Sequence, residues 1–151
     1  MAQPTIHNVP PSPEEFNRLR AQVGWPTYPP EACRAVMQHS LCHVCVRCNG
    51  ELAAYGRIVG DGSTVFYIQD VIVAPEYRKQ GYSLRVMDHI MAYIMQHAAP
   101  KAFVGLMAAW QVEGLYEKYG FLVRPLTGKL GPGMTLPADW NEPDKGNEYK
   151  E

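Results

Sequence analysis

The segment FYIQDVIVAPEYRKQGYS, residues 66–83, decides how the chain folds. It opens with an apolar run typical of a buried strand, passes through Arg78 and Lys79 to Gly81, and leads directly into a helical pattern. The sequence therefore predicts a strand, a cationic loop and a helix start. Backbone N–H groups and the dipole at a helix N-terminus bind phosphate well, so a local anion site is one interpretation. A plain strand-to-helix turn with solvated cations is the other.

The strand that opens this segment, from Thr64 to Val73, is apolar on both faces. Simple alternation assigns its side chains to two opposite faces: Phe66, Ile68 and Ile72 on one, and Val65, Tyr67, Val71 and Val73 on the other. A strand of this kind predicts a central position in a sheet that is covered on both sides.

Two further strands and two helices are predicted upstream. The strands LCHVCVR (41–47) and ELAAYGRIV (51–59) flank Asn49-Gly50, which is the strongest short hairpin signal. The next turn is expected at Asp61-Gly62. The order of these elements indicates antiparallel strands joined by short turns.

The first predicted helix begins at Ser12, which forms a capping box with Glu15, and ends at Gly24. A second, short helix is expected over residues 31–39. Between them the proline-rich stretch WPTYPP, residues 25–30, is unsuited to regular structure.

Downstream of the cationic loop the pattern alternates between helices and strands. The apolar stripe over residues 81–97 predicts a long helix. A buried strand over 103–108, a short helix over 111–119, a strand over 121–124 and an edge strand over 131–140 are expected to follow. Helices, hairpin strands and then one helical crossover predict an α+β (mixed α/β) fold.

Length and charge narrow the class of protein. A chain of 151 residues fits one domain with a real core. Its formal net charge of -1 argues against a protein that binds nucleic acid by bulk electrostatics, so any anion site must be local. The first 15 residues lack a signal-peptide pattern, and no apolar run reaches membrane-spanning length. A cytoplasmic protein that binds no membrane is the expectation.

Four cysteines raise the question of a metal site: Cys33, Cys42, Cys45 and Cys48. His39 and His43 lie near them in the sequence. A structural zinc site usually takes ligands from two separated knuckles, and no second knuckle follows downstream. If 41–47 is a strand, Cys45 points away from Cys42. Buried, reduced thiols without metal are therefore the favoured prediction, with a zinc site as the alternative.

Three motifs carry a resemblance to a known family. The central strand ends in Val73-Ala74-Pro75, the long helix opens with Arg78-x-x-Gly81-x-Ser83, and Tyr116-Glu117-Lys118-Tyr119-Gly120-Phe121 follows downstream. Over residues 41–136 the chain resembles the GNAT superfamily of acetyl-CoA-dependent N-acetyltransferases. The stretch GRIVGDG, residues 56–62, is familiar from a small single-domain branch of bacteria and fungi.

This resemblance implies a GNAT-like fold, in which a mixed, mostly antiparallel sheet of about six to seven strands is flanked by about four helices. It implies a single acetyltransferase domain over residues 1–140 and a polar tail over 141–151. It also implies acetyl-CoA as cosubstrate and coenzyme A as product, with no metal and no nucleic acid partner. A homodimer is compatible with it.

In this family the loop and the helix start hold the pyrophosphate of coenzyme A through backbone N–H groups. The resemblance assigns this role to seven residues: Arg78, Lys79, Gln80, Gly81, Tyr82, Ser83 and Leu84. It assigns main-chain contacts with the pantetheine arm to Val71, Ile72 and Val73. Because this arm is rich in amides, it needs an unpaired strand edge. Two residues depart from the family pattern: Ser83 replaces the usual glycine or alanine, and Ala109 replaces an asparagine that contacts the cofactor in many members.

The resemblance aligns Tyr116 with the family's general acid, which protonates the leaving thiolate. A packed aromatic ring on a short helix is the alternative. The developing oxyanion is expected to meet a backbone N–H group near Val71 or Ile72. The general base is open: Asp70 is the nearest carboxylate, acting through water or only anchoring the structure, and His43 is a weaker candidate.

Trp25 and Tyr28 are the predicted acceptor-binding residues. An aromatic wall suits an amine with an apolar body, although the same segment could serve only as a stiff cover for the sheet. The sequence thus predicts transfer of an acetyl group to a small-molecule primary amine. A protein or peptide N-acetyltransferase and a non-catalytic acyl-CoA-binding domain are the alternatives.

Overall fold

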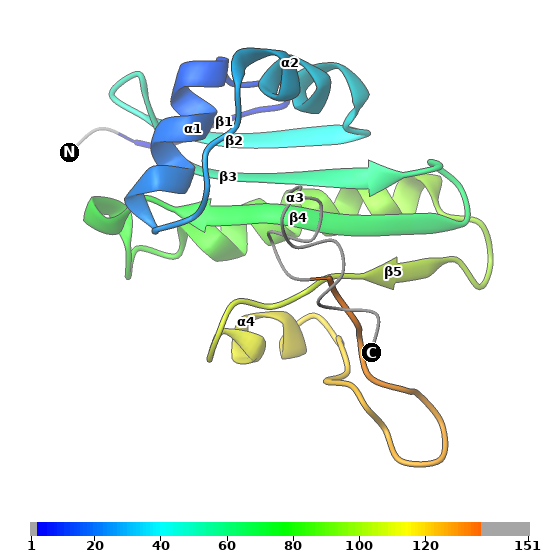
Figure 1. The fold of residues 1–151 in the computed structure, drawn as a ribbon. Helices are drawn as coiled ribbons and strands as arrows, with labels where there is room; N and C mark the ends of the chain where they lie inside the picture. The colour runs from blue at the N-terminus through cyan, green and yellow to red at the C-terminus, as the bar shows by residue number, and fades with distance from the viewer. Residues whose placement is uncertain (1–2, 137–151) are drawn as a thin grey trace, which may run out of the picture. The chain divides into compact units, whose positions relative to one another are not determined.

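The computed structural model describes residues 3–136 (Figure 1). The chain divides into two compact units, Met1–Ala109 and Trp110–Glu151. The single domain expected over 1–140 stays a prediction, and the tail over 141–151 lies outside the described residues. Among the described residues, no helix combines the length and apolar character needed to cross a bilayer.

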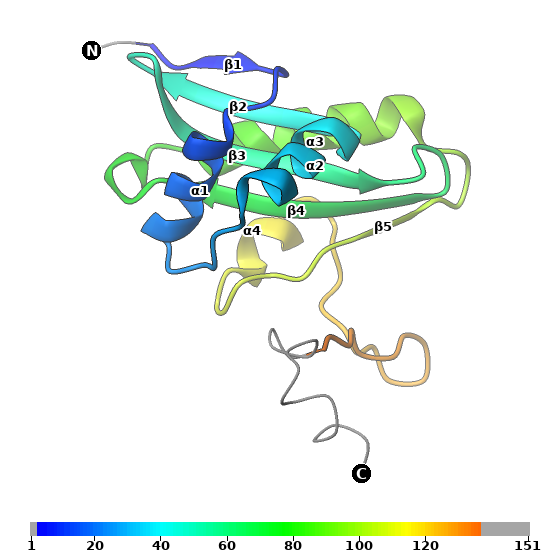
Figure 2. The same ribbon diagram turned by 45° about the horizontal axis from the view of Figure 1, so that its top comes forward.

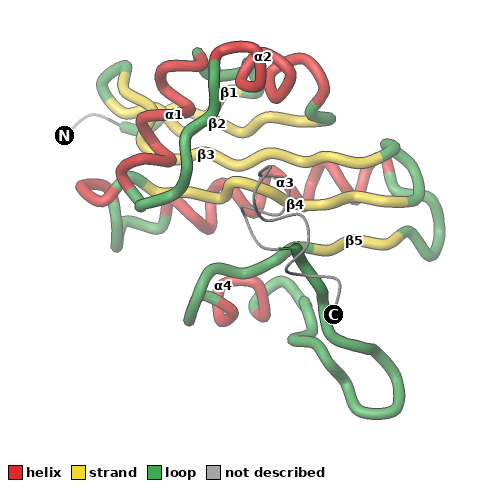
Figure 3. Tube along the Cα trace, viewed as in Figure 1, coloured by secondary structure: helices red, strands yellow, loops and turns green. Residues whose placement is uncertain are grey.

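The first unit is built on one sheet of five strands in the order β1-β2-β3-β4-β5, drawn in yellow in Figure 3. The strands are β1 Thr5–His7, β2 Cys42–Cys48, β3 Glu51–Gly60, β4 Val65–Val73 and β5 Phe103–Gly105. The pairs β1/β2, β2/β3 and β3/β4 are antiparallel, whereas β5 runs parallel to β4. The predicted fold class is therefore confirmed, with five strands among residues 3–136 in place of the expected six to seven.

The helices of the first unit cover both faces of this sheet. Figure 2 shows α1 (Pro13–Gln22) and α2 (Pro30–His39) on one face and α3 (Tyr82–His97) on the other. A short 3-10 turn, η1 (Pro75–Tyr77), connects β4 to the loop before α3. The fourth helix, α4 (Glu113–Glu117), belongs to the second unit.

Local sequence signals explain where the first elements begin and turn. The Ser12 hydroxyl accepts a hydrogen bond from the Glu15 amide at 3.1 Å, and the Glu15 carboxylate accepts one from the Ser12 amide, so the predicted capping box is present. Asn49 and Gly50 both have positive φ, as a tight two-residue hairpin requires. The turn from β3 to β4 is held by the Asp61 carboxylate, which accepts from the amides of residues 63–65.

A β-bulge in β4 changes which side chains face each helix layer. Tyr55 pairs with Ile72 but Arg57 pairs with Gln69, so Gly56 alone faces Asp70 and Val71. Asp70 takes a left-handed φ of 57° at this point. The bulge reverses the alternation, so Ile72 does not share a face with Phe66 and Ile68 as simple alternation predicted.

The pairing register shows the corrected faces. A Cβ added at Gly56 would meet Val86 and Ile90 of α3, so Gly56 and Ile58 face α3, and Ile68, which pairs with Ile58, faces it too. Ile72 packs in the opposite layer with Phe16 of α1. The two-residue alternation of the sequence cannot reveal this change of face, because one inserted residue moves every following side chain to the opposite face.

The predictions of strands near the C-terminal end were wrong for the described residues. The strand expected over 103–108 is reduced to β5, and residues 121–124 and 131–136 form no strand. The second unit instead contains α4, a ring contact between Tyr116 and Phe121 at 6.2 Å, and a turn closed between Leu126 and Leu130. The rest of the expected strand over 131–140 lies outside the described residues.

The four cysteines are free thiols buried in the first unit. Cys45 pairs across the sheet with Tyr55 and belongs to the α1 layer, whereas Cys42 pairs with Ile58 on the α3 side. The prediction that these two thiols point to opposite faces is confirmed. Within residues 3–136, no three His, Cys, Asp or Glu side chains are grouped so that they could hold a metal ion.

His43 is buried beneath α2 as a neutral imidazole. Its Nε2 lies 3.1 Å from the Met37 carbonyl oxygen, which can only accept, so Nε2 carries the proton and Nδ1 accepts from the Tyr55 hydroxyl at 2.7 Å. Burial lowers the pKa of His43 below its ordinary value of 6.5, opposed by the Met37 bond and assisted by the charge of Arg57. Both ring nitrogens are therefore used in structural contacts.

The free energy of unfolding is expected to fall as the pH drops below 6.5. Because the folded pKa of His43 is lowered, the unfolded chain takes up the proton first, so the stabilisation is complete above the unfolded pKa and is lost on acidification. Urea unfolding of the parent and of His43→Asn between pH 8 and pH 5 measures this. Equal pH slopes for the two proteins would contradict the assignment.

Candidate functional site

The junction between β4 and α3 is an exposed, curled loop. Arg78, Lys79 and Gln80 are exposed, and Lys79 has a left-handed φ of 62°. Gly81 is the N-cap of α3 with φ 78°, and its carbonyl accepts the first helical bond, from the amide of Arg85 at 3.2 Å. A Cβ at Gly81 would meet no atom within 4 Å, so a side chain at this position would point into open space.

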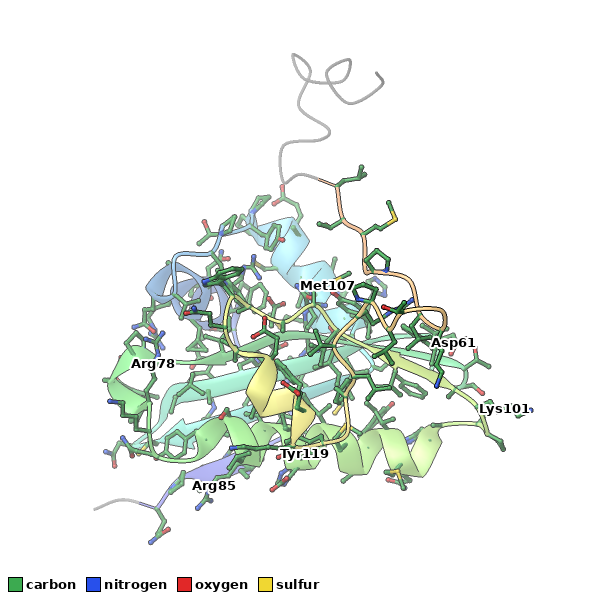
Figure 4. All side chains as sticks on the ribbon, turned by 90° about the horizontal axis from the view of Figure 1, so that it is seen from below. Asp61, Arg78, Arg85, Lys101, Met107 and Tyr119 are labelled. Atoms are coloured by element: carbon green, nitrogen blue, oxygen red, sulfur yellow. The ribbon has the colours of Figure 1, made fainter. Side chains whose placement is uncertain are left out.

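This helix start has the features of an anion site. Amides in the first turn of a helix have no acceptor within the helix, and the dipole adds positive potential there. Figure 4 shows Arg78 and Arg85 at this end of α3. The ring of Tyr77 stacks on that of Tyr82, with centroids 6.0 Å apart, which fixes the 3-10 turn against the helix. The cationic loop is therefore held at the helix N-terminus.

The strand leading into this junction has an unpaired edge. β5 pairs only with residues 65–67 of β4, and β4 is next to no other strand on that side of the sheet. Within the first unit, the backbone of residues 68–73 is therefore open along one edge. This edge includes Val71, Ile72 and Val73, which the sequence assigned to the pantetheine arm. An amide-rich ligand could pair with it as an added strand.

Beside this edge, Asp70 forms a buried ion cluster with two arginines. One carboxylate oxygen accepts from Nη1 of Arg20 on α1, and the other accepts from Nε of Arg57 on β3 at 2.8 Å. The side chain of Asp70 is 0% exposed. We call these three residues the Asp70 cluster. Since both oxygens accept from guanidinium groups, the geometry favours the anchoring role expected for Asp70, and its role as a base stays a prediction.

The predicted acceptor-binding aromatic residues surround one arginine of this cluster. The Arg20 guanidinium lies 5.5 Å from the Trp25 ring and 4.8 Å from the Tyr28 ring, and its Nε donates to the Pro26 carbonyl at 2.7 Å. Cation–π contacts of this kind stabilise a partly desolvated guanidinium. The segment of residues 25–28 thus packs onto the Asp70 cluster. Its role in acceptor binding stays a prediction.

The two arginines were missed by sequence reasoning, although a signal existed for each. Arg20 follows Phe16 by four residues, so it falls on the apolar face of α1, where a charge needs a partner. Arg57 follows Tyr55 by two residues on β3 and therefore points to the same covered face. The sequence did not reveal that Asp70 is their shared partner, because the bulge sets its direction.

Tyr116 lies in the second unit, on α4. It is the buried residue of this short helix, and its ring meets that of Phe121 edge-on. Burial raises the pKa of Tyr116, so its phenol is protonated at neutral pH. Tyr119, three residues further on, is half-buried.

A family profile and solved structures that match this chain are both of acetyltransferases. Residues 10–121 match the sequence profile of the Acetyltransferase (GNAT) family. A structure of a probable acetyltransferase of unknown function from methicillin-resistant Staphylococcus aureus is 30% identical with a TM-score of 0.81, and the match covers 89% of this chain and 99% of that one. A GNAT-family acetyltransferase from Streptococcus pneumoniae is 25% identical with a TM-score of 0.73, covering 89% and 98%. The search of curated proteins found no match.

Replacing Gly81 by glutamate is expected to abolish thermal stabilisation by acetyl-CoA. The substitution adds bulk and negative charge at the open helix start, and a ligand that binds only the native state raises the melting temperature in the parent. Thermal unfolding with and without acetyl-CoA measures the shift.

Gly24→Glu is the matched control, because Gly24 has the same φ of 78° and equally open surroundings after α1. Both variants carry similar backbone strain, so only the loss of the ligand shift should distinguish them. An undiminished shift in Gly81→Glu would exclude this loop as the phosphate site.

Replacing Asp70 by asparagine is expected to cost about 3–5 kcal/mol of unfolding free energy, because it leaves two largely buried guanidinium groups without a carboxylate. Glu15→Gln is the control. It breaks the more exposed Arg47 pair but can retain the capping box, so about 1 kcal/mol or less is expected. Urea unfolding at pH 7 compares them, and equal losses would contradict the anchoring role.

Proposed function

We propose that this chain, which belongs to the acetyltransferase (GNAT) family, transfers the acetyl group of acetyl-CoA to a primary amine of a small molecule. One observation carries the proposal: the open edge of β4 leads within a few residues to the N-terminal end of α3. A strand edge suits the amides of pantetheine, and a helix start suits a diphosphate. Coenzyme A contains both groups in this order.

The cosubstrate is proposed to lie along the residues assigned from the family motif. Its pantetheine arm pairs with the backbone of Val71, Ile72 and Val73. Its diphosphate accepts hydrogen bonds from backbone N–H groups between Arg78 and Leu84. Ser83 is half-buried in the first turn of α3, and its small side chain is compatible with a close approach of phosphate.

The proposed reaction is direct attack without an acetyl-enzyme intermediate. The neutral amine nitrogen attacks the thioester carbonyl carbon, and the oxyanion accepts from a backbone N–H near Val71 or Ile72. The C–S bond then breaks, and the thiolate sulfur takes the phenol proton of Tyr116. The attacking nitrogen releases its own proton to a base, for which Asp70 acting through water is the standing prediction.

Two other functions remain as alternatives. A protein or peptide N-acetyltransferase would use the same cosubstrate with a larger acceptor, and a non-catalytic domain would bind acyl-CoA without turnover. A panel of small amines and peptides, mixed with acetyl-CoA and read by free thiol release, separates them. Release with small amines supports the proposal. Release with peptides alone, or binding without release, supports one of the alternatives. A homodimer and a cytoplasmic location stay predictions.

Tyr116→Phe is expected to slow the chemical step by roughly a hundredfold, the usual scale for losing a positioned acid. The ring and its packing against Phe121 are kept, so the affinity for acetyl-CoA should change little. Single-turnover rates at saturating cosubstrate measure the step without interference from product release.

Tyr119→Phe is the control, because it removes a hydroxyl from the same segment at a position outside the proposed machinery. It should leave the single-turnover rate nearly unchanged. Full activity in Tyr116→Phe would show that water or another group protonates the thiolate.

A further inference from the structure

We propose that the acceptor amine carries an anionic group, a carboxylate or a phosphate, and that Arg57 binds it. The inference rests on the proposed acetyltransferase function and deepens it, because it names the class of acceptor. It starts from the Asp70 cluster, in which Arg20, Arg57 and Asp70 come from α1, β3 and β4.

Among residues 3–136, the Asp70 cluster carries a net positive charge. Two guanidinium groups share one carboxylate, so the formal charge is 2 - 1 = +1. Within residues 3–136 the other ion pair joins Arg47 to Glu15 and supplies no carboxylate to the cluster. His43, the titratable side chain packed beside it, is neutral because its pKa is lowered by burial and by the charge of Arg57. A net positive charge in a partly dry environment favours binding of an anion.

Arg57 has donors available for such an anion, whereas Arg20 is more enclosed. In Arg57, Nε donates to Asp70 and Nη1 donates to the Ser40 hydroxyl at 3.2 Å. Among residues 3–136 no hydrogen-bond partner contacts Nη2, so this nitrogen is available to a ligand. The Arg57 side chain is 15% exposed, against 7% for Arg20.

The surface around Arg57 is polar and partly open. Gln69 pairs with Arg57 across the sheet, and Tyr67 lies two residues before Gln69 on the same face. All three residues are half-buried. In Figure 1, α1 crosses the end of β4, whereas neither α1 nor α2 crosses its beginning. The fork of a guanidinium matches the oxygen pairs of carboxylate and phosphate.

The position of Arg57 also suits the proposed reaction. Arg57 is directly opposite Gln69, and Val71, beside which the thioester is proposed to lie, is two residues along the same strand. Neighbouring strands are about 5 Å apart, and Gln69 and Val71 are separated by less than the roughly 7 Å of two regular rises, because the bulge lies between them. A compact molecule with its amine a few bonds from its anion spans this distance. An α-amino acid and an aminoalkyl phosphate are the two simplest examples.

Matched pairs of amines test the inference in the full-length protein. One arm compares an α-amino acid with its amide, and the other compares phosphoethanolamine with ethanolamine, each at saturating acetyl-CoA. The expected kcat/KM for the anionic member of at least one pair is about tenfold to a hundredfold higher, the scale of a charged hydrogen bond. The arm with the larger ratio identifies carboxylate or phosphate.

Arg57→Gln should reduce this ratio to near one, because the neutral amide keeps some bulk but lacks the charge. Asp70 then keeps Arg20 as a one-to-one partner, so the fold should survive, and thermal stabilisation by acetyl-CoA verifies this. Arg47→Gln is the matched control: it removes an arginine on β2 that is also paired with a carboxylate, Glu15 of α1, and it should preserve the ratio.

Equal kcat/KM within both pairs, or a ratio that Arg57→Gln leaves unchanged, would overturn the inference while leaving the acetyltransferase function intact. If no amine releases thiol, the proposed function fails, and calorimetric titration of the same amines into the protein with coenzyme A decides the anion site. Binding of the anionic amine that Arg57→Gln abolishes supports the site. Absence of such binding overturns it.

Discussion

The buried carboxylate of Asp70 is the group on which the geometry of the first unit depends. It holds a left-handed residue inside a central strand, at the point where β4 has one residue more than β3. Such a backbone conformation costs free energy for a residue with a side chain and persists only where the surroundings enforce it. Here the enforcement comes from two guanidinium groups, one on α1 and one on β3. The same carboxylate thus joins a helix to the sheet and fixes the bulge.

The bulge connects the packing of the sheet to its proposed chemistry. It lets β4 place Tyr67, Gln69 and Asp70 toward α1 and α2, while Val71 turns toward α3. Beyond residue 67 the strand has no partner on its outer edge in the first unit, and it then leads to the N-terminus of α3. One strand therefore presents a polar surface, an open edge and the approach to a helix N-terminus, to which the proposed function assigns the acceptor, pantetheine and the diphosphate. The function proposed here needs all three features close together.

The sequence predicted elements whose signals are local. The capping box at Ser12 and the Asn49-Gly50 turn were found because each depends on a few adjacent residues. The short strand β1 was missed, since three residues carry no periodicity and it forms only by pairing with β2. Phosphate binding stays a proposal, and the loop before α3 was predicted from a motif. The Asp70 cluster was not, because its members are far apart in sequence and the bulge decides where Asp70 points.

A crystal structure of the protein with coenzyme A tests the central claim most directly. We expect the diphosphate within hydrogen-bond distance of backbone amides at the start of α3, and the pantetheine arm paired with residues 71–73 of β4. The Asp70 carboxylate should remain between Arg20 and Arg57 in that complex. A diphosphate bound elsewhere, or a β4 edge occupied by another strand of the chain, would contradict the account.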